Sequence, residues 1–141
     1  MLAFWDTSAL VKLCVRSQSS PRAHELLRDT EVIAWWATLV EGRSSLVRLQ
    51  REGILSATAF RASWRHFSDL VNASKEVAPS DNVREIAFRQ LDRFPLRAAD
   101  GLQLAAALAW CEERPRGRWF VCSDRRLAAA AVDAGFDVKS V

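Results

Sequence analysis

The feature that most constrains the fold of this chain is a short apolar run that ends in an acidic residue and is followed at once by a helical pattern. Residues 1–5 form the run, Asp6 ends it, and residues 9–13 carry apolar side chains at helical spacing. This order predicts a buried strand that leads through a tight turn into a helix. Asp is also a preferred helix cap, so Asp6 by itself does not identify a site.

The same arrangement occurs again near the other end of the chain. Residues 119–122 are apolar without polar alternation, which predicts a strand buried on both faces. Asp124 follows, and an alanine-rich helical segment runs from there to Gly135. If the two strands are neighbours in a parallel sheet, Asp6 and Asp124 lie at one carboxyl edge, where open α/β folds bind their ligands.

Strands and helices alternate along the rest of the chain, which favours a parallel sheet with helices on both faces. The length of 141 residues is typical of one domain, so we expect a single domain over residues 1–141. Residues 77–79 are at best a short extended piece, because a proline cannot donate to a ladder. The further predicted elements are strands over residues 31–35 and 136–138 and helices over residues 21–27, 38–52, 56–71, 81–91 and 96–111.

Polar residues at the starts of three of these helices are predicted caps: Thr38, Ser56 or Thr58, and Asp81. With Thr38 as the cap, Glu41 lies three residues later and completes a capping box. On a helical wheel, Glu41 lies opposite the apolar stripe of its helix. The pattern therefore predicts a capping or solvent-facing side chain at Glu41.

A fourth acidic residue lies at the start of a different kind of helix. The segment that begins at Leu96 is apolar almost all round, so this helix is predicted to be buried between other elements. Asp100, in its first turn, is therefore expected to be drawn towards the interior of the fold.

Asp6, Glu41, Asp100 and Asp124 thus have two interpretations. Each is explained separately as a cap or a surface acid, or the four meet at one edge of the sheet. Two like charges 4 Å apart repel by about 4 kcal/mol at an effective dielectric constant of 20, so such a site needs protons or a cation. Carboxylates without His or Cys favour a hard cation, Mg²⁺ or Mn²⁺. These ions support phosphodiester hydrolysis by activating the attacking water.

The charge of the chain permits a nucleic-acid partner without demonstrating one. The net charge is +3, and only three of the 20 basic residues are lysine. Guanidinium groups suit phosphate, although arginine-biased codon use would give the same excess. The candidates for contacts to a phosphate backbone are the arginines near the acidic residues: Arg43, Arg48, Arg97 and Arg125.

The three cysteines lie in apolar sequence without the spacing of a metal site, at Cys14, Cys111 and Cys122. We expect them to be buried free thiols of a cytoplasmic protein. The N-terminus has no basic leader, and the longest apolar block, residues 104–111, is too short to span a bilayer. The sequence therefore predicts neither a signal peptide nor a membrane anchor.

Four features in order resemble a known family. They are residues 6–13 (DTSALVKL), Glu41 in the helix after the second strand, residues 96–107 (LRAADGLQLAAA) and residues 121–131 (VCSDRRLAAAA). Together they resemble the PIN-domain ribonucleases, and among these the VapC-type toxins of bacterial type II toxin-antitoxin systems. The resemblance covers the whole chain. Two positions depart from the family: Cys122 stands where Thr is frequent, and Gly101, where Ala is common, is expected to loosen the start of its helix.

The resemblance implies an α/β fold, a three-layer α/β/α sandwich around a short, mainly parallel sheet. It also implies that Asp6, Asp100 and Asp124 ligate Mg²⁺ or Mn²⁺, and that Glu41 ligates a metal or orients the nucleophilic water. Ser8 would hold a carboxylate or a metal-bound water. The implied activity is endonucleolytic cleavage of RNA that leaves 5′-phosphate and 3′-hydroxyl ends. The implied partners are the RNA substrate, a cognate VapB-like antitoxin and a second copy of the chain in a homodimer.

Other functions remain open at this point. The chain is alternatively an RNA-processing nuclease of the same fold without an antitoxin, or a non-catalytic module that binds RNA or a protein partner. Loss of an acid would favour the module, and none is missing. A receiver or phosphatase fold also places an Asp after its first strand, but it uses a dedicated lysine late in the chain. Here the only late lysine is Lys139, in the terminal segment.

Overall fold

The computed structural model describes all of residues 1–141 and contains five strands and seven α-helices. In chain order they are β1 (Leu2–Trp5), α1 (Thr7–Cys14), a 3₁₀ turn (Arg16–Gln18), α2 (Pro21–Asp29), β2 (Glu31–Trp35), α3 (Thr38–Arg51), α4 (Ala57–Asn72), β3 (Lys75–Val77), α5 (Asp81–Arg93), α6 (Ala98–Trp110), β4 (Trp119–Cys122), α7 (Arg125–Ala134) and β5 (Asp137–Ser140).

The strands form one sheet in the order β3-β2-β1-β4-β5, and every neighbouring pair is parallel. Phe4 in the central strand β1 lies opposite Ile33 of β2 and Phe120 of β4. The prediction that the two acid-ended strands are neighbours is therefore confirmed. The chain adds β2 and β3 on one side of β1 and then β4 and β5 on the other, so β1 and β4 flank the point where the direction of winding changes.

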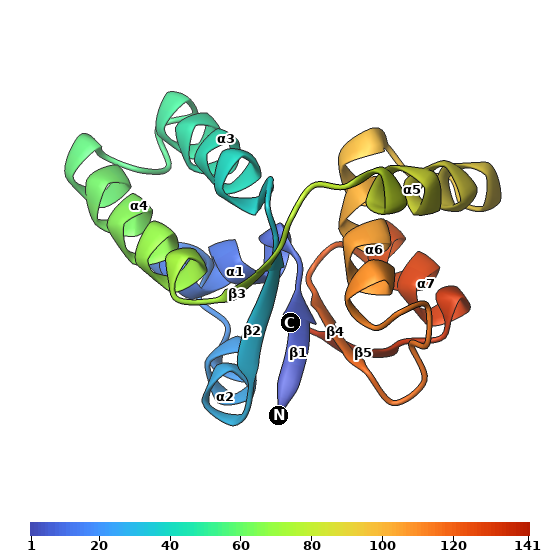
Figure 1. Cartoon of the computed structure of the whole chain (residues 1–141). Coiled ribbons are helices and arrows are strands. Elements are labelled where there is room, and N and C mark those ends of the chain that lie inside the picture. Colours follow the sequence, from blue (N-terminus) through green and yellow to red (C-terminus); the bar gives the residue numbers. More distant parts are fainter.

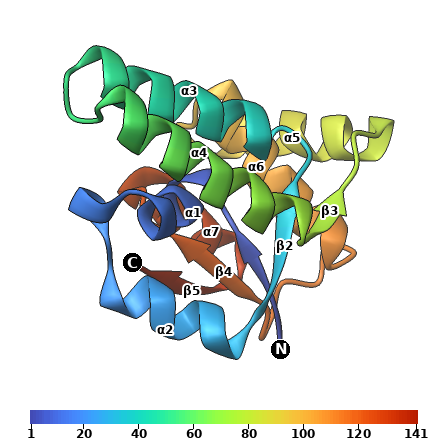
Figure 2. The ribbon, with the colours of Figure 1, turned by 90° about the vertical axis from the view of Figure 1, so that its left-hand side faces the viewer.

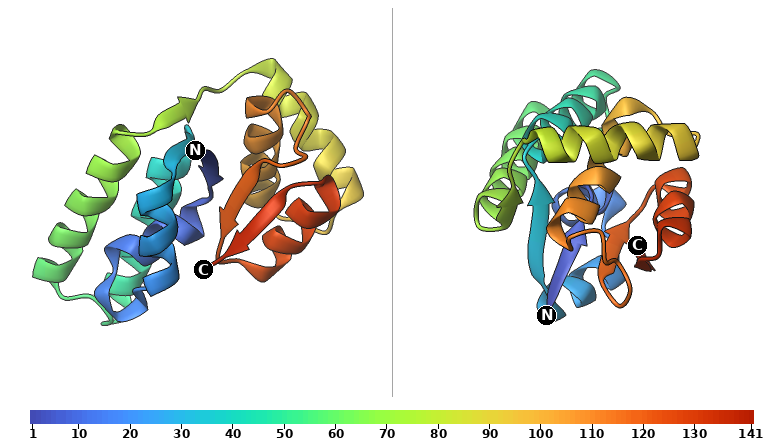
Figure 3. Two further views of the ribbon diagram at one scale, coloured as in Figure 1. Left: turned by 90° about the horizontal axis from the view of Figure 1, so that it is seen from below. Right: turned by 45° about the vertical axis from the view of Figure 1, so that its right-hand side comes forward.

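Helices cover both faces of the sheet, which confirms the three-layer sandwich. Phe4, Ile33 and Phe120 face a core that α5, α6 and α7 complete. The alternate residues Trp5 and Val121 face a second core that α1 to α4 complete. Figure 1 shows the two groups of helices on either side of the strands, and the left view of Figure 3 shows the same separation. In Figure 2, α3 and α4 lie side by side over one face.

Two glycines allow neighbouring helices to approach closely. A Cβ atom on Gly101 of α6 would lie 2.7 Å from Cδ2 of Leu91 in α5, and a Cβ atom on Gly42 of α3 would overlap the Phe67 ring of α4. The structure gives Gly101 a packing role in addition to the expected loosening of its helix, because α5 packs closely against α6 at this residue.

The helix starts differ from the predictions by small shifts. Ser80 rather than Asp81 caps α5, with its hydroxyl accepting from the N–H of Val83, and Ser56 caps α4. Thr38 is the first residue of α3 and caps nothing; its side chain is fully buried. The predicted capping box of Thr38 and Glu41 is therefore wrong.

The short edge strands are each displaced by a residue or two from their predictions. β3 ends at Val77, before Pro79, and β5 begins at Asp137 rather than at Phe136, which is buried. All three cysteines are buried and unpaired, as predicted. None of the helices has both the length and the apolar character needed to cross a membrane.

Candidate active site

Asp6 lies at the carboxyl end of β1 and caps α1. Its carboxylate accepts from the N–H of Ala9 at 3.1 Å, and the Ser8 hydroxyl is 2.8 Å from both carboxylate oxygens. The side chain is only 3% exposed. The pKa of Asp6 is raised to about 7, mainly by burial and also by the charge of Asp124, whereas the hydrogen bonds from Ser8 and Ala9 act to lower it. Asp6 is thus both a helix cap and an electrostatically costly buried acid.

Asp124 occupies the equivalent place after β4. It caps α7, and its Oδ1 accepts from the N–H of Leu127 at 2.8 Å. The side chain is exposed, and its charge raises the pKa values of both Asp6 and Asp100. The parallel pairing of β1 and β4 therefore brings Asp6 and Asp124 into electrostatic contact, as the sequence pattern predicted.

Asp100 lies in the first turn of the buried helix α6 and is itself half-buried. Burial raises its pKa most, and the charge of Asp124 raises it further. The guanidinium groups of Arg97 and Arg126 lower it. The expectation that the apolar helix draws this acid towards the interior is confirmed.

Glu41 is not the solvent-facing side chain that its helical wheel predicts. Its Oε2 accepts from the Thr7 hydroxyl and from Nε2 of Gln103, both at 2.6 Å. Burial is the main cause of its raised pKa, and the charge of Asp100 adds to it. The wheel fails because it considers only the stripe that faces the sheet. The first turn of α3 is also covered from the side by residues of α1 and α6.

These four acids, which we call the acidic rim, lie in the first turns or at the caps of α1, α3, α6 and α7. Their mutual effects on pKa run from Glu41 through Asp100 and Asp124 to Asp6. β1 runs upward from the N-terminus in Figure 1, so its carboxyl end points between the α3–α4 pair and the α5–α6 pair. Helix N-termini carry partial positive charge, which favours carboxylates at this place.

The donor set of the acidic rim fits a hard cation. It consists of carboxylate and hydroxyl oxygens, without His, and Mg²⁺ typically binds through one or two carboxylates and completes its shell with water and phosphate oxygens. No group of three or more Asp, Glu, His or Cys side chains is already arranged with the geometry of a metal site. The four carboxylates are nevertheless close enough to repel one another, and a divalent cation would offset this repulsion.

Ser8 connects the two strand-end turns. Its hydroxyl group, which donates to Asp6, also accepts from the backbone N–H of Ser123 at 3.0 Å. The residue before Asp124 is thereby fixed relative to Asp6. The predicted contact between Ser8 and a carboxylate is therefore present.

The predicted arginines differ in their placement. Arg97 lies within electrostatic range of Asp100. Arg48 lines a hollow of about 170 Å³ together with Ser8 and Ser123, and Arg125 lines another of about 370 Å³ beside Asp124. These three lie near the acidic rim.

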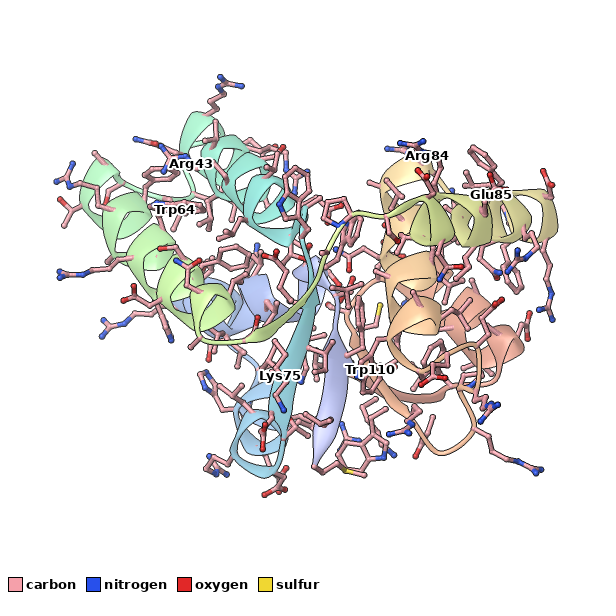
Figure 4. All side chains as sticks on the ribbon, viewed as in Figure 1. Arg43, Trp64, Lys75, Arg84, Glu85 and Trp110 are labelled. Atoms are coloured by element: carbon pink, nitrogen blue, oxygen red, sulfur yellow. The ribbon has the colours of Figure 1, made fainter.

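Arg43 lies elsewhere. Its guanidinium is 4.8 Å from the ring centroids of both Phe60 and Trp64 in α4. Figure 4 shows Arg43 and Trp64 next to each other in the α3–α4 pair. Arg43 is therefore directed to α4 rather than to Glu41, which corrects its predicted position.

Sequence reasoning missed Thr7 and Gln103, which bind Glu41, and Arg126, whose charge lowers the pKa of Asp100. Gln103 had a detectable signal, because it is the one polar side chain in the apolar stretch from Gly101 to Trp110. A surface hollow of about 670 Å³ between the end of α1 and α4 contains none of the four acids.

No model of a known protein family matches the sequence, and a search for curated relatives gives no significant match. Solved structures do match. The chain aligns with a toxin-antitoxin complex from Klebsiella pneumoniae (13% identity, 98% of this chain and 96% of that one, TM-score 0.65). It aligns with VapBC-5, a member of the VapBC family of toxin-antitoxin systems from Mycobacterium tuberculosis (17% identity, 99% and 98%, TM-score 0.68).

A third match is FitAcB from Neisseria gonorrhoeae, at 17% identity over 96% of this chain and 97% of that one, with a TM-score of 0.67. At such identities the likeness concerns the fold. It extends over nearly the whole of each chain, so no large segment lies outside the shared architecture. The chain therefore has the PIN-like α/β/α fold of these toxin-antitoxin proteins, the fold that the sequence resemblance implied.

Proposed function

We propose that this chain is a Mg²⁺- or Mn²⁺-dependent endoribonuclease that acts as the toxin of a toxin-antitoxin pair. The observation that carries the proposal is the acidic rim. Asp6, Glu41, Asp100 and Asp124 come from separate segments, and three of them have pKa values raised by burial and by a neighbouring acid. Clustered, partly buried acids of this kind are typical of functional sites.

Asp6, Asp100 and Asp124 would hold the cation, and Glu41 would hold it or orient the attacking water. When bound, the cation supplies positive charge that offsets the carboxylates and lowers the pKa of the water that attacks the phosphodiester. Ser8 and the N–H of Ala9 keep the Asp6 carboxylate in place. Thr7 and Gln103 do the same for Glu41.

The charges around the rim support a nucleic acid as the substrate. Arg97 and Arg126 lie beside Asp100, and Arg48 and Arg125 line the neighbouring hollows. We assign these four to contacts with backbone phosphates, which position a nucleic acid without reading its sequence. Attack by water on phosphorus with departure of the 3′ oxygen leaves a 5′-phosphate and a 3′-hydroxyl end.

The toxin role is supported by the fold shared with the VapBC-5 and Klebsiella toxin-antitoxin structures. The proposed partners are a VapB-like antitoxin that covers the acidic rim and a second copy of this chain. The test is to look for a small open reading frame next to the gene and to co-express its product with this chain. A toxin should co-purify with its product and be inhibited by it. An active enzyme with no such partner would instead be an RNA-processing nuclease.

The catalytic part is tested by removing single negative charges from the rim. Asp6→Asn and Asp100→Asn should abolish cleavage of a labelled RNA in Mg²⁺ or Mn²⁺ while the circular dichroism spectrum stays unchanged. Asp92→Asn is the matched control, because Asp92 is an exposed acid of α5 with no side-chain partner, and it should cut like the parent. Cleavage by the rim variants at the parental rate would overturn the proposal.

A further inference from the structure

Gln103 brings a polar group into the most apolar helix of the fold. Its side chain is 2% exposed, and Leu104 and three buried alanines follow it. Its Nε2 faces three oxygens from two other helices, at 2.6 Å from Oε2 of Glu41, 2.9 Å from the Thr7 hydroxyl and 3.2 Å from the Thr38 hydroxyl. One amide group thus connects α6 to α1 and α3 at the carboxylate of Glu41.

The other end of the same amide has no partner. Oε1 of Gln103 is buried without a hydrogen bond, and a buried carbonyl oxygen of this kind costs free energy. A methionine of similar length would avoid that cost, but it would leave Oε2 of Glu41 and the Thr38 hydroxyl without the amide donor. What the amide provides is an N–H donor directed at Glu41, whose carboxylate only accepts.

We propose that Gln103 is the positioning residue of Glu41: together with the Thr7 hydroxyl it fixes Oε2 and leaves Oε1 available to the cation or the attacking water. The structure records hydrogen bonds to Oε2 alone. The inference rests on the proposed nuclease function, because Glu41 has a role in catalysis only there. Partners of this kind orient the groups that bind a metal or its water, and their loss typically lowers activity 10- to 100-fold.

The first test is Gln103→Met. We expect kcat for RNA cleavage to fall roughly 10- to 100-fold with KM changed less than about twofold, while the circular dichroism spectrum stays that of the folded parent. Gln103→His retains an N–H donor at the same reach and should recover most of the lost kcat. A Gln103→Met enzyme with the parental kcat would show that the inference is wrong.

The matched control is Gln90→Met. Gln90 in α5 is also buried, at 7% exposure, and its Oε1 is also without a partner, but it makes no side-chain contact with the rim. We expect its kcat to be unchanged. A double variant tests the route of the effect: adding Gln103→Met to Glu41→Ala should cost no further activity if Gln103 acts through Glu41. A further loss of the same size as in the parent would contradict this.

A second readout needs neither metal nor RNA. In the ¹⁵N-labelled metal-free protein, a side-chain N–H of Gln103 should resonate downfield of an ordinary glutamine amide, and Glu41→Ala should move it back while the Gln90 signals stay in place. Unmoved Gln103 signals in an inactive Glu41→Ala protein would reject the inference and leave the nuclease function intact. Moved signals in a fully active Glu41→Ala protein would confirm the contact but remove Glu41 from the proposed function.

Discussion

The backbone N–H of Asp6 donates to the carbonyl oxygen of Val121 at 3.1 Å, so the acid that ends β1 is fixed to β4 just before Asp124. This bond continues the β1–β4 ladder by one residue beyond the strand. It holds Asp6 within range of a second negative charge while the fold buries it. The cost of that placement should be visible in the stability of the metal-free protein.

Asp6 should make the metal-free protein less stable as the pH rises. Because its pKa moves from 3.8 to about 7 on folding, the folded state binds a proton in this window that the unfolded chain has released. The free energy of unfolding then falls with rising pH, by up to about 4 kcal/mol from this group. Asp6→Asn, which keeps a capping oxygen, should be more stable than the parent at pH 7.5 and equal to it near pH 4.

The measurement is urea unfolding in EDTA at several pH values, with Asp92→Asn as the control. The difference between parent and Asp6→Asn, compared with that between parent and Asp92→Asn, measures Asp6 together with its coupling to Asp124. Parallel curves for the parent and Asp6→Asn between pH 4 and 7 would contradict the shifted pKa of Asp6.

Mg²⁺ or Mn²⁺ should reverse this pH effect in the parent. A cation that binds only the folded state stabilises it by about 2.7 kcal/mol at a concentration 100 times its dissociation constant. We expect a rise in melting temperature with Mn²⁺ at pH 7.5 and a much smaller one at pH 5, where Asp6 is protonated. The rise should shrink in Asp100→Asn and persist in Asp92→Asn, measured by differential scanning fluorimetry. An equal rise in all proteins at both pH values would indicate binding elsewhere.

The strand-end acids were predictable because their positions depend on local order alone. An apolar run followed by an acid and a helical pattern fixes where Asp6 and Asp124 lie once the strands are parallel neighbours. Asp100 was predictable for a related reason, since a helix with almost no polar face has to be buried. Each inference needed only one element and one rule of sheet geometry.

Glu41, Gln103 and Arg126 were not predictable in the same way. A helical wheel describes one helix against one core, whereas Glu41 is covered by side chains that α1 and α6 bring from distant parts of the chain. The placement of Arg126 near Asp100 depends on which residue begins α7, because one residue is about 100° of rotation. The same shift of one residue separates Ser80 from Asp81 at the cap of α5.

Substitutions of Arg126 and Arg43 should distinguish an arginine that contacts phosphate from one that packs on aromatic rings. If Arg126 contacts a backbone phosphate, Arg126→Ala should raise KM for RNA at low salt and reduce the slope of log KM against log salt by about 0.7, the value for one single-strand contact. Arg43→Ala should leave that slope unchanged and lower the free energy of unfolding by about 0.5–1 kcal/mol, because its guanidinium lies over two aromatic rings. Steady-state cleavage between 50 and 300 mM KCl, about the range in which such contacts are resolved, measures both slopes. Equal slopes for the parent and Arg126→Ala would exclude the phosphate contact.

Gly101→Ala should destabilise the fold through one contact, although alanine favours a helix more than glycine does. The added Cβ would lie 2.7 Å from Cδ2 of Leu91, and overpacking of this kind costs about 1–3 kcal/mol against a helix-propensity gain of about 1 kcal/mol. In a Leu91→Ala background the clash disappears, so Gly101→Ala should there be neutral or stabilising. The double-mutant cycle by urea unfolding isolates this term. Gly42→Ala should cost more than Gly101→Ala, because its new methyl group meets the fully buried Phe67 ring rather than a half-buried leucine. A Gly101→Ala protein as stable as the parent would show that α5 and α6 separate at little cost, and that the glycine is not required for their close packing.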